Sequence, residues 1–382
     1  MRFSGLKYLI AGCGFWGAVL AERIATVLDE KVLIIDKKNH IGGASYSETD
    51  SQTGINVHKY GSHIFHTKSQ KVWDYINRFS DFNDYKHRVL VKHKDKIYPF
   101  PINLKTINSF YNLNLSSSQA EEFIKNETLK SNIKDPKNFE EKAISLVGEK
   151  LYNSFIKNYS EKHWGIDPKF LPKELFSRIP LRINDDSNYF LNEFQGIPVK
   201  GYDNLFKNLL SDKNIELLLN TDYFEIKNEI PSSCKIIYSG EIDKFFNYKY
   251  GNLSWRSLHF ESQILDVQNY QGTSVMNFSD IEIPYTRIHE FKHFMPEKTE
   301  IFNSKKTIIA FEYPKNYAIN SEAFYPVNTE KDKEIYQKYL KEASQNQNLI
   351  VGGRLGLYRY LNMDKTVEDA LSTFETILRK EN

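Results

Sequence analysis

The 382-residue chain is long enough for two or three domains, and its 40% hydrophobic and 26% charged residues are typical of a folded protein. Its 51 Lys and Arg and 49 Asp and Glu give a net charge of +2, which argues against a nucleic acid or an anionic membrane as the main partner. The two cysteines, Cys13 and Cys234, have no CxxC spacing and predict neither a disulfide framework nor a zinc site. The sequence shows no signal peptide and no long apolar stretch, so we expect a cytoplasmic protein without integral membrane association.

The first motif is glycine-rich. A short apolar run ends in Gly12-Cys-Gly-Phe-Trp-Gly17, a segment with helical apolar spacing follows, and a second apolar run closes on Asp36. This order predicts a βαβ unit that binds a dinucleotide. The first glycine permits the tight turn, Gly14 lets the backbone approach a diphosphate, and Gly17 lets the helix pack close to the strand. The helix N-terminus attracts the diphosphate, and Asp36 is placed to accept from a ribose hydroxyl.

The glycine motif alone does not distinguish NAD from FAD. Gly42-Gly43 offers a second stretch of backbone without side chains, which suits another close approach to the same diphosphate and favours FAD; an ordinary loop turn is the alternative.

Three histidines, His58, His63 and His66, lie within nine residues, so a metal site has to be considered. Because their run holds no carboxylate or cysteine, we predict no metal and expect this loop to place one histidine against the flavin.

The rest of the chain changes character several times. Residues 88–98 predict a β-hairpin that ends at Pro99 and Pro101. Helical patterns run from about residue 104 to 176, with Ser118 and Glu121 as one capping pair. Short strands at residues 215–219 and 235–238 suggest a return to the first domain, and segments between residues 257 and 311 predict a mostly antiparallel second sheet. A buried strand at 349–354 and a helix at 366–379 close the chain.

One helical stretch carries an aromatic stripe. Tyr152, Phe155, Ile156 and Tyr159 recur at helical spacing, and Trp164 continues beyond them. Most such stripes belong to a core, but an aromatic wall for a planar base fits the pattern equally well. Both readings stay open at this point.

These residues together resemble the UDP-galactopyranose mutase family over nearly the whole chain. Several of the motifs that carry the resemblance have no generic role. They are Gly12-Cys-Gly-Phe-Trp-Gly17, His40-Ile-Gly-Gly43, His58-Lys-Tyr-Gly-Ser-His-Ile-Phe-His-Thr67, Tyr159-Ser-Glu-Lys-His-Trp-Gly165, Asn188-Tyr-Phe190, Phe194-Gln-Gly-Ile-Pro198, Pro284-Tyr-Thr-Arg287 and Gly353-Arg-Leu-Gly-Leu-Tyr-Arg-Tyr360.

The resemblance implies an α/β fold in three parts. A discontinuous Rossmann-type FAD-binding domain is expected at residues 1–80, 196–253 and 346–382. A helical domain with a mobile loop is expected at 104–178, and an antiparallel β-sheet domain at 81–103, 179–195 and 254–345. Closure of the mobile loop over the substrate would exclude water.

The resemblance also implies an isomerase. The family interconverts UDP-galactopyranose and UDP-galactofuranose, without net redox change, for cell-surface polysaccharide synthesis. The reaction passes through a covalent adduct of reduced FAD N5 with the anomeric carbon of the sugar, so the protein orients the cofactor and handles charge. An external electron donor, NAD(P)H or a reduced flavodoxin, is then needed, and a homodimer is left open.

Site residues follow from the matching motif positions. The resemblance implies catalytic roles for Arg178 and Arg287, which would hold the diphosphate, and for His63 beneath the flavin. The implied substrate-binding residues are Phe155, Tyr159, Ser160, Trp164, Tyr189, Tyr325, Tyr360, His87 and Asn362. The implied cofactor-binding residues are Gly12, Gly14, Phe15, Gly17, Asp36, Lys37, Gly43, His63, Arg354, Tyr360 and Asp364.

Departures from the family pattern concern the sugar. His87 stands where a small polar residue is common, Ser62 replaces a Pro or Ala, and Ser160 replaces a Thr. His66 favours plain galactose over an N-acetylated sugar. The alternatives are a mutase of the same mechanism acting on UDP-N-acetylgalactosamine or dTDP-fucose, an FAD-dependent oxidoreductase, and a non-catalytic flavin-binding protein.

Overall fold

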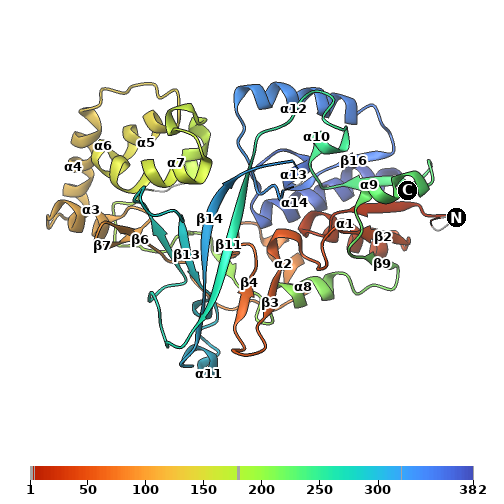
Figure 1. Cartoon of the computed structure of the whole chain (residues 1–382), viewed down its shortest axis with the longest axis horizontal. Coiled ribbons are helices and arrows are strands. Elements are labelled where there is room, and N and C mark those ends of the chain that lie inside the picture. The colour runs from red at the N-terminus through yellow and green to blue at the C-terminus, as the bar shows by residue number, and fades with distance from the viewer. Residues whose placement is uncertain (1–2, 4, 179–180, 320, 382) are drawn as a thin grey trace.

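The computed structural model describes residue 3 and residues 5–178, 181–319 and 321–381. Figure 1 shows an α/β part that contains both chain ends, long strands through the middle of the molecule, and a group of helices on the opposite side of those strands. The dinucleotide motif lies in the α/β part, and the aromatic stripe lies among the separate helices.

Within the described residues, five parallel strands form the first sheet in the order β16-β10-β1-β2-β9. They are β1 (Tyr8–Ala11), β2 (Val32–Ile35), β9 (Ile215–Leu218), β10 (Lys235–Tyr238) and β16 (Leu349–Val351). The central strands β1 and β2 are buried throughout, as expected of apolar runs in a parallel sheet covered on both faces. The strands predicted near residues 8, 32, 215, 235 and 349 are thus confirmed.

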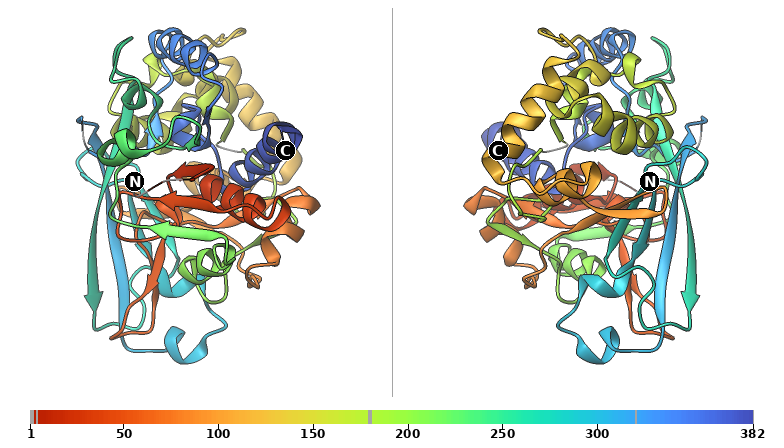
Figure 2. Two further views of the ribbon diagram at one scale, coloured as in Figure 1. Left: turned by 90° about the vertical axis from the view of Figure 1, so that its right-hand side faces the viewer. Right: turned by 90° about the vertical axis from the view of Figure 1, so that its left-hand side faces the viewer.

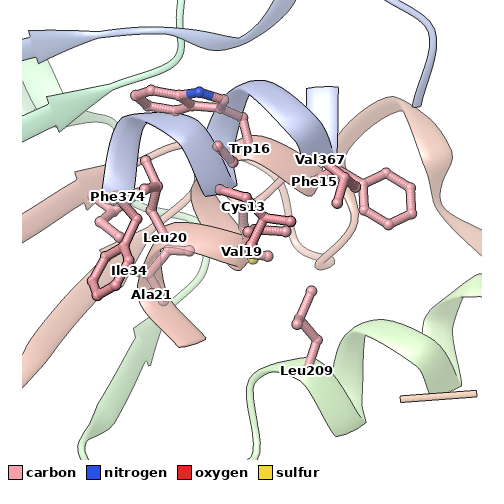
Figure 3. Close-up of a cluster of buried hydrophobic side chains, with 14 of the residues drawn as sticks. Cys13, Phe15, Trp16, Val19, Leu20, Ala21, Ile34, Leu209, Val367 and Phe374 are labelled. Atoms are coloured by element: carbon pink, nitrogen blue, oxygen red, sulfur yellow. The ribbon is translucent and has the colours of Figure 1, made fainter. Parts of the chain in front are cut away.

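Helices close both faces of this sheet. On one face α1 (Phe15–Val27) packs against α14 (Met363–Thr373), and Val19 and Leu20 meet Val367 and Phe374 in the cluster of Figure 3. On the other face, Ile335 and Tyr339 of α12 (Glu330–Ala343) are buried in the same cluster as residues of β1 and β2. Figure 2 shows the C-terminal segment returning to lie beside the N-terminal helix. The C-terminal segment therefore helps to fix α1, the helix that follows the glycine turn.

The second sheet is mixed and has the order β15-β11-β14-β13-β12-β6-β7. Its strands are β6 (Val89–His93), β7 (Lys96–Phe100), β11 (Trp255–Leu265), β12 (Val275–Phe278), β13 (Arg287–Glu290), β14 (Thr307–Asn316) and β15 (Tyr325–Pro326). All its pairings are antiparallel except β12 with β6. The prediction that Pro99 ends the hairpin was wrong, because β7 is an edge strand and tolerates a proline within it.

The separate helices pack on the β6–β7 end of this sheet. They are α3 (Leu104–Tyr111), α4 (Ser117–Leu129), α5 (Phe139–Val147), α6 (Glu149–Leu151), a π-helical turn (Tyr152–Lys157) and α7 (Asn158–Trp164). The predicted capping pair of α4 was wrong by two residues, because Ser116 and Gln119 exchange hydrogen bonds as a capping box. Phe155 joins the two parts, with its ring 5.1 Å from that of Tyr98 on β7.

The remaining elements are short or lie at the periphery. Two small antiparallel pairs join β3 (Ser47–Thr49) to β4 (Asn56–His58) and β5 (Phe65–Thr67) to β8 (Phe194–Gly196). Further α-helices are α2 (Gln70–Asn77), α8 (Tyr202–Leu209), α9 (Tyr223–Ile226), α10 (Ile242–Phe245), α11 (Thr299–Phe302), α13 (Gly353–Gly356) and α15 (Arg379–Glu381). Among the described residues, no helix combines the length and apolarity needed to cross a bilayer.

Candidate active site

The three glycines of the first motif occupy different environments. Gly12 has a positive φ of 111°, and a Cβ atom there would lie 2.1 Å from Ser239 Oγ. A Cβ atom on Gly17 would lie 2.1 Å from the carbonyl oxygen of Gly12, so the close contact of α1 with the turn requires glycine. Around Gly14, by contrast, no described atom beyond its chain neighbours lies within 4 Å of such a Cβ atom. The backbone at Gly14 is therefore open to a ligand.

Asp36 and the second glycine pair meet this turn. The Asp36 carboxylate accepts hydrogen bonds from the backbone N–H of Cys13 at 2.8 Å and of Lys38 at 2.9 Å. Gly42 N donates to Cys13 O at 2.9 Å, and a Cβ atom on Gly43 would lie 3.1 Å from Gly14 Cα. A carboxylate has room for further donors, so Asp36 is held rigidly and remains able to accept from a ligand hydroxyl.

A cavity of about 230 Å³ opens above these groups. Its lining includes eight of the residues expected to bind the cofactor: Gly12, Gly14, Phe15, Asp36, Lys37, Gly43, His63 and Arg354. Gly17 lies beneath the turn, and Asp364 is buried in α14 with its Oδ1 atom lacking a hydrogen-bond partner in the described structure. The open backbone at Gly14, the Asp36 carboxylate and the adjoining cavity together fit a dinucleotide such as FAD.

His63 and Arg354 both line the cavity. His63 Nδ1 lies 2.7 Å from the carbonyl oxygen of Gly61, and burial lowers the pKa of His63 to about 4. The imidazole is therefore neutral near pH 7, with its proton on Nδ1 and an acceptor at Nε2. The Arg354 guanidinium donates to Leu361 O at 2.7 Å.

An aromatic cluster adjoins Arg354. We define it as Tyr159, His163, Trp164, Tyr325 and Tyr360. The Arg354 guanidinium lies 5.0 Å from the Tyr360 ring and 5.7 Å from the Tyr325 ring. Tyr325 and Tyr360 stack with centroids 5.0 Å apart, and Tyr325 lies 5.2 Å from His163. Arg354 thus touches both the dinucleotide cavity and the aromatic cluster, so the two sites are contiguous.

Arg287 is the cation on the far side of this cluster. Its Nε donates to Tyr159 Oη at 2.8 Å, and its Nη1 lies 3.5 Å from Glu312 Oε2. Burial alone would lower the pKa of Arg287, but Glu312 and the neighbouring phenols raise the pKa well above its usual value. Burial likewise opposes ionisation of Glu312, but Arg287 and His289 hold the pKa of that carboxyl below its usual range. Both groups are therefore charged at neutral pH.

His87 and Tyr189 lie next to Arg287. Burial, with Arg287 as the next cause, lowers the pKa of His87 to about 3, and Tyr189 also interacts electrostatically with Arg287. The Tyr189 N–H donates to the His87 carbonyl at 2.6 Å, and the His87 ring lies 5.8 Å from Phe190. His87 is thus a neutral imidazole in aromatic surroundings.

The other predicted substrate residues are placed differently. Phe155 lies in the hydrophobic core between Tyr98 and Phe110, and Ser160 is buried. Asn362 precedes the first turn of α14, where its carbonyl accepts from Thr366 N. Arg178 ends a short 3₁₀ helix (Lys173–Arg178), and its side chain lies outside the described residues.

The π-helical turn separates the aromatic stripe into two sets. Tyr152, Phe155 and Ile156 point into the core, whereas Tyr159 at the start of α7 reaches Arg287. A π-turn inserts one residue into the helical repeat and rotates the residues after it about the helix axis. The core reading therefore holds for the first three residues, whereas Tyr159 faces Arg287, and an aromatic wall for a planar base stays a prediction.

Sequence reasoning missed four residues that organise this region: Lys162, His163, His289 and Glu312. Lys162 Nζ donates to the carbonyls of Phe278, Asp280, Ile283 and Tyr285 at 2.9, 2.8, 3.0 and 3.1 Å. It therefore ties α7 to the loop that leads into Arg287. Lys162 and His163 lie in the motif at residues 159–165, so that motif could have pointed to them. His289 and Glu312 lie in none of the motifs that carry the resemblance. Across the described chain, no group of three His, Cys, Asp or Glu residues is arranged to hold a metal ion.

Comparison with protein families matches residues 154–360 to a model described as UDP-galactopyranose mutase. Residues 10–79 match a model described as NAD(P)-binding Rossmann-like domain. These ranges contain the Arg287 region and the glycine turn, respectively. The two parts of the site described above therefore correspond to two independently recognised sequence patterns.

Individual relatives cover almost the whole chain. A dTDP-fucopyranose mutase of Escherichia coli is 39% identical over 98% of this chain and 98% of its own length. A Klebsiella pneumoniae protein named "Probable UDP-galactopyranose mutase" is 38% identical over 97% of this chain and 94% of its own. Among solved structures, a reduced UDP-galactopyranose mutase superposes with a TM-score of 0.75 at 15% identity, covering 98% of this chain and 96% of that one, which shows the common fold.

Proposed function

Because the chain belongs to the UDP-galactopyranose mutase family of nucleotide-sugar mutases, we propose that it interconverts UDP-galactopyranose and UDP-galactofuranose with reduced FAD. The observation that carries this proposal is the position of Arg287: a charged guanidinium bonded to Tyr159, within reach of Tyr189 and Tyr325, next to the cavity that fits a dinucleotide. The furanose product would serve cell-surface polysaccharide synthesis.

Family membership implies FAD, and the cavity has groups suited to hold it. The open backbone at Gly14 and the N-terminus of α1 would face the diphosphate, and Asp36 would accept from the ribose. Arg354, His63 and Asp364 would contact the flavin ring of the cofactor. Bound and reduced, FAD would supply the nucleophile for the anomeric carbon of the sugar.

The protein's own contribution is electrostatic. Breaking the bond between the anomeric carbon and the diphosphate leaves negative charge on the diphosphate oxygens. A guanidinium at 4 Å interacts with a unit negative charge by about 4 kcal/mol at an effective dielectric of 20. Arg287 is held for this role by Tyr159, and we propose Arg178 as a second cation. The phenols of Tyr189, Tyr325 and Tyr360 would donate hydrogen bonds to the same oxygens.

A second substrate warrants a direct comparison, because the E. coli relative at 39% identity is a dTDP-fucopyranose mutase. Fucose has a methyl group where galactose has a hydroxymethyl group, so an apolar surface near that carbon favours fucose. The Phe190 ring, which stacks 5.8 Å from the His87 ring, offers such a surface. We keep UDP-galactose as the leading substrate and dTDP-fucose as the second candidate.

The test is turnover by the dithionite-reduced protein under anaerobic conditions. UDP-galactofuranose and dTDP-fucofuranose would be supplied separately, and pyranose product would be separated by ion-pair chromatography. The proposal expects conversion of the UDP sugar with the higher kcat/KM; conversion of the dTDP sugar alone would select the second candidate. Substrate-dependent bleaching of oxidised flavin without isomerisation would instead show an oxidoreductase.

A further inference from the structure

Four residues from three segments, Ser62, His289, Glu312 and Arg287, form a continuous polar chain. Ser62 Oγ lies 2.6 Å from His289 Nδ1, His289 Nε2 lies 3.0 Å from Glu312 Oε2, and that oxygen lies 3.5 Å from Arg287 Nη1. His289 and Glu312 are almost completely buried, with exposed fractions of 0% and 1%. The mechanism proposed above uses neither His289 nor Ser62.

Strand geometry explains why the chain converges. Arg287 and His289 are two residues apart on β13 and therefore lie on the same face of the sheet. Glu312 is the direct cross-strand partner of Arg287 on β14. Its carboxylate is thus flanked by both side chains, while Thr286 Oγ1 bonds the other oxygen at 3.2 Å.

The donors and acceptors can be assigned from chemistry. A carboxylate with a low pKa only accepts, so His289 Nε2 must carry a proton and donate it to Glu312. The Ser62 hydroxyl, which can donate or accept, pairs with Nδ1 on the other side of the ring. Glu312 therefore fixes the proton on Nε2, and Ser62 directly precedes His63, which lines the dinucleotide cavity.

The consequence concerns Arg287. Charge-assisted contacts between arginine and a carboxylate close to about 2.7–2.9 Å when nothing competes. Here His289 already donates to Glu312 Oε2, and Arg287 Nη1 stays at 3.5 Å. The Arg287 guanidinium is consequently held by Tyr159 and only loosely by Glu312, which leaves its Nη groups available for an anion.

We propose that His289 is a positioning residue, which saturates Glu312 and thereby keeps Arg287 free to bind the diphosphate of the nucleotide sugar. This inference rests on the proposed function only in the identity of that anion. Without the Nε2 donor, Arg287 would close onto Glu312 and withdraw from the ligand.

Two substitutions at His289 separate this role from simple packing. His289→Gln retains an N–H donor near the Nε2 position, whereas His289→Asn retains only a group near Nδ1. Binding of UDP and of uridine to the oxidised FAD-loaded protein would be measured by calorimetry. We expect His289→Asn to weaken UDP binding about 10- to 100-fold, as for loss of a hydrogen bond to a charged group, and His289→Gln to weaken it less than about threefold. Uridine, which lacks the diphosphate, should bind all three proteins equally.

Equal losses in the two variants, or equal losses for UDP and uridine, would overturn the proposal. If His289→Asn does not fold, His289→Phe carries the test, because it keeps a ring of similar size but has no donor: it should lower UDP affinity without changing uridine affinity, and unchanged UDP affinity would refute the role. A native protein that binds neither UDP nor dTDP would contradict the proposed function instead. If dTDP is preferred, dTDP and thymidine replace UDP and uridine throughout.

Discussion

Arg287 Nε and Tyr159 Oη are joined by a 2.8 Å hydrogen bond between β13 and α7. This bond links the mixed sheet to the separate helices at the aromatic cluster, which adjoins Arg354 of the dinucleotide cavity. Residues from both parts are therefore needed to present a single cation.

The first prediction concerns that cation. Arg287→Ala should lower kcat/KM about 10²- to 10³-fold, the range found when one preorganised donor to developing charge is removed. Arg287→Lys keeps the charge but loses the planar guanidinium, so its kcat/KM should lie between those of the native protein and Arg287→Ala. Turnover by reduced protein measures the effect, with FAD content as the check on folding. The exposed Arg379 provides a matched control, and equal activity of Arg287→Ala and Arg379→Ala would contradict the proposed role.

The glycine turn gives a second prediction with an internal control. Gly14→Ala should fold normally, because Gly14 has ordinary β-region angles and open space, but should bind FAD at least tenfold more weakly. Gly17→Ala should lower the free energy of unfolding by about 1–3 kcal/mol, since its methyl group meets the Gly12 carbonyl. Thermal unfolding in excess FAD and flavin absorbance of the purified proteins separate the two effects. Full flavin content in Gly14→Ala would show that the diphosphate does not bind against the Gly14 backbone.

Lys162 supports a third prediction. Lys162→Met removes the only cation described as bonding the four carbonyls of the loop before Arg287, and should lower the free energy of unfolding by about 2–4 kcal/mol. Because the loop leads into Arg287, UDP affinity should fall as well. Urea unfolding and UDP titration measure the two effects, and Lys125→Met on the exposed face of α4 is the control. If the stability and UDP affinity of Lys162→Met match those of the control, Lys162 does not hold the loop before Arg287 in place.

A fourth prediction concerns acid stability. Burial lowers the pKa of His87 from 6.5 to about 3. Between these values the unfolded chain binds a proton that the folded chain does not, so stability falls as pH falls below 6.5, by up to about 1.4 kcal/mol per pH unit for this residue. His87→Asn, whose amide can still pair with Tyr85, should show a shallower decline of stability from pH 6.5 to 4. Parallel pH profiles for the two proteins would refute the assignment.

The sequence predicted the parts of the fold that depend on local patterns. The strand at residues 235–238 matched because an apolar run bounded by polar residues has one stable placement in a parallel sheet. Helix α12, which covers the second face of that sheet, was missed because most of its residues are polar and only a few, such as Ile335 and Tyr339, are buried.

The candidate site divides in the same way. Gly12 and Asp36 lie in a motif whose residue types favour dinucleotide binding, and Arg287 was expected from the resemblance to the family. His289 and Glu312 meet only through the register of β13 with β14, which is fixed by long-range strand pairing. Ser62 was noted as a departure from the family pattern, but its partner His289 became visible only once the loop and the sheet were brought together.

The π-helical turn ahead of α7 makes the geometry of the site depend on a residue count. Successive residues of a helix differ by about 100° around the axis. Loss of one residue between Tyr152 and Lys157 would turn every later side chain of α7 by that angle and carry Tyr159 away from Arg287. The side chains of this turn can therefore vary within the limits of packing. Its length cannot, because Tyr159 must meet Arg287 on β13.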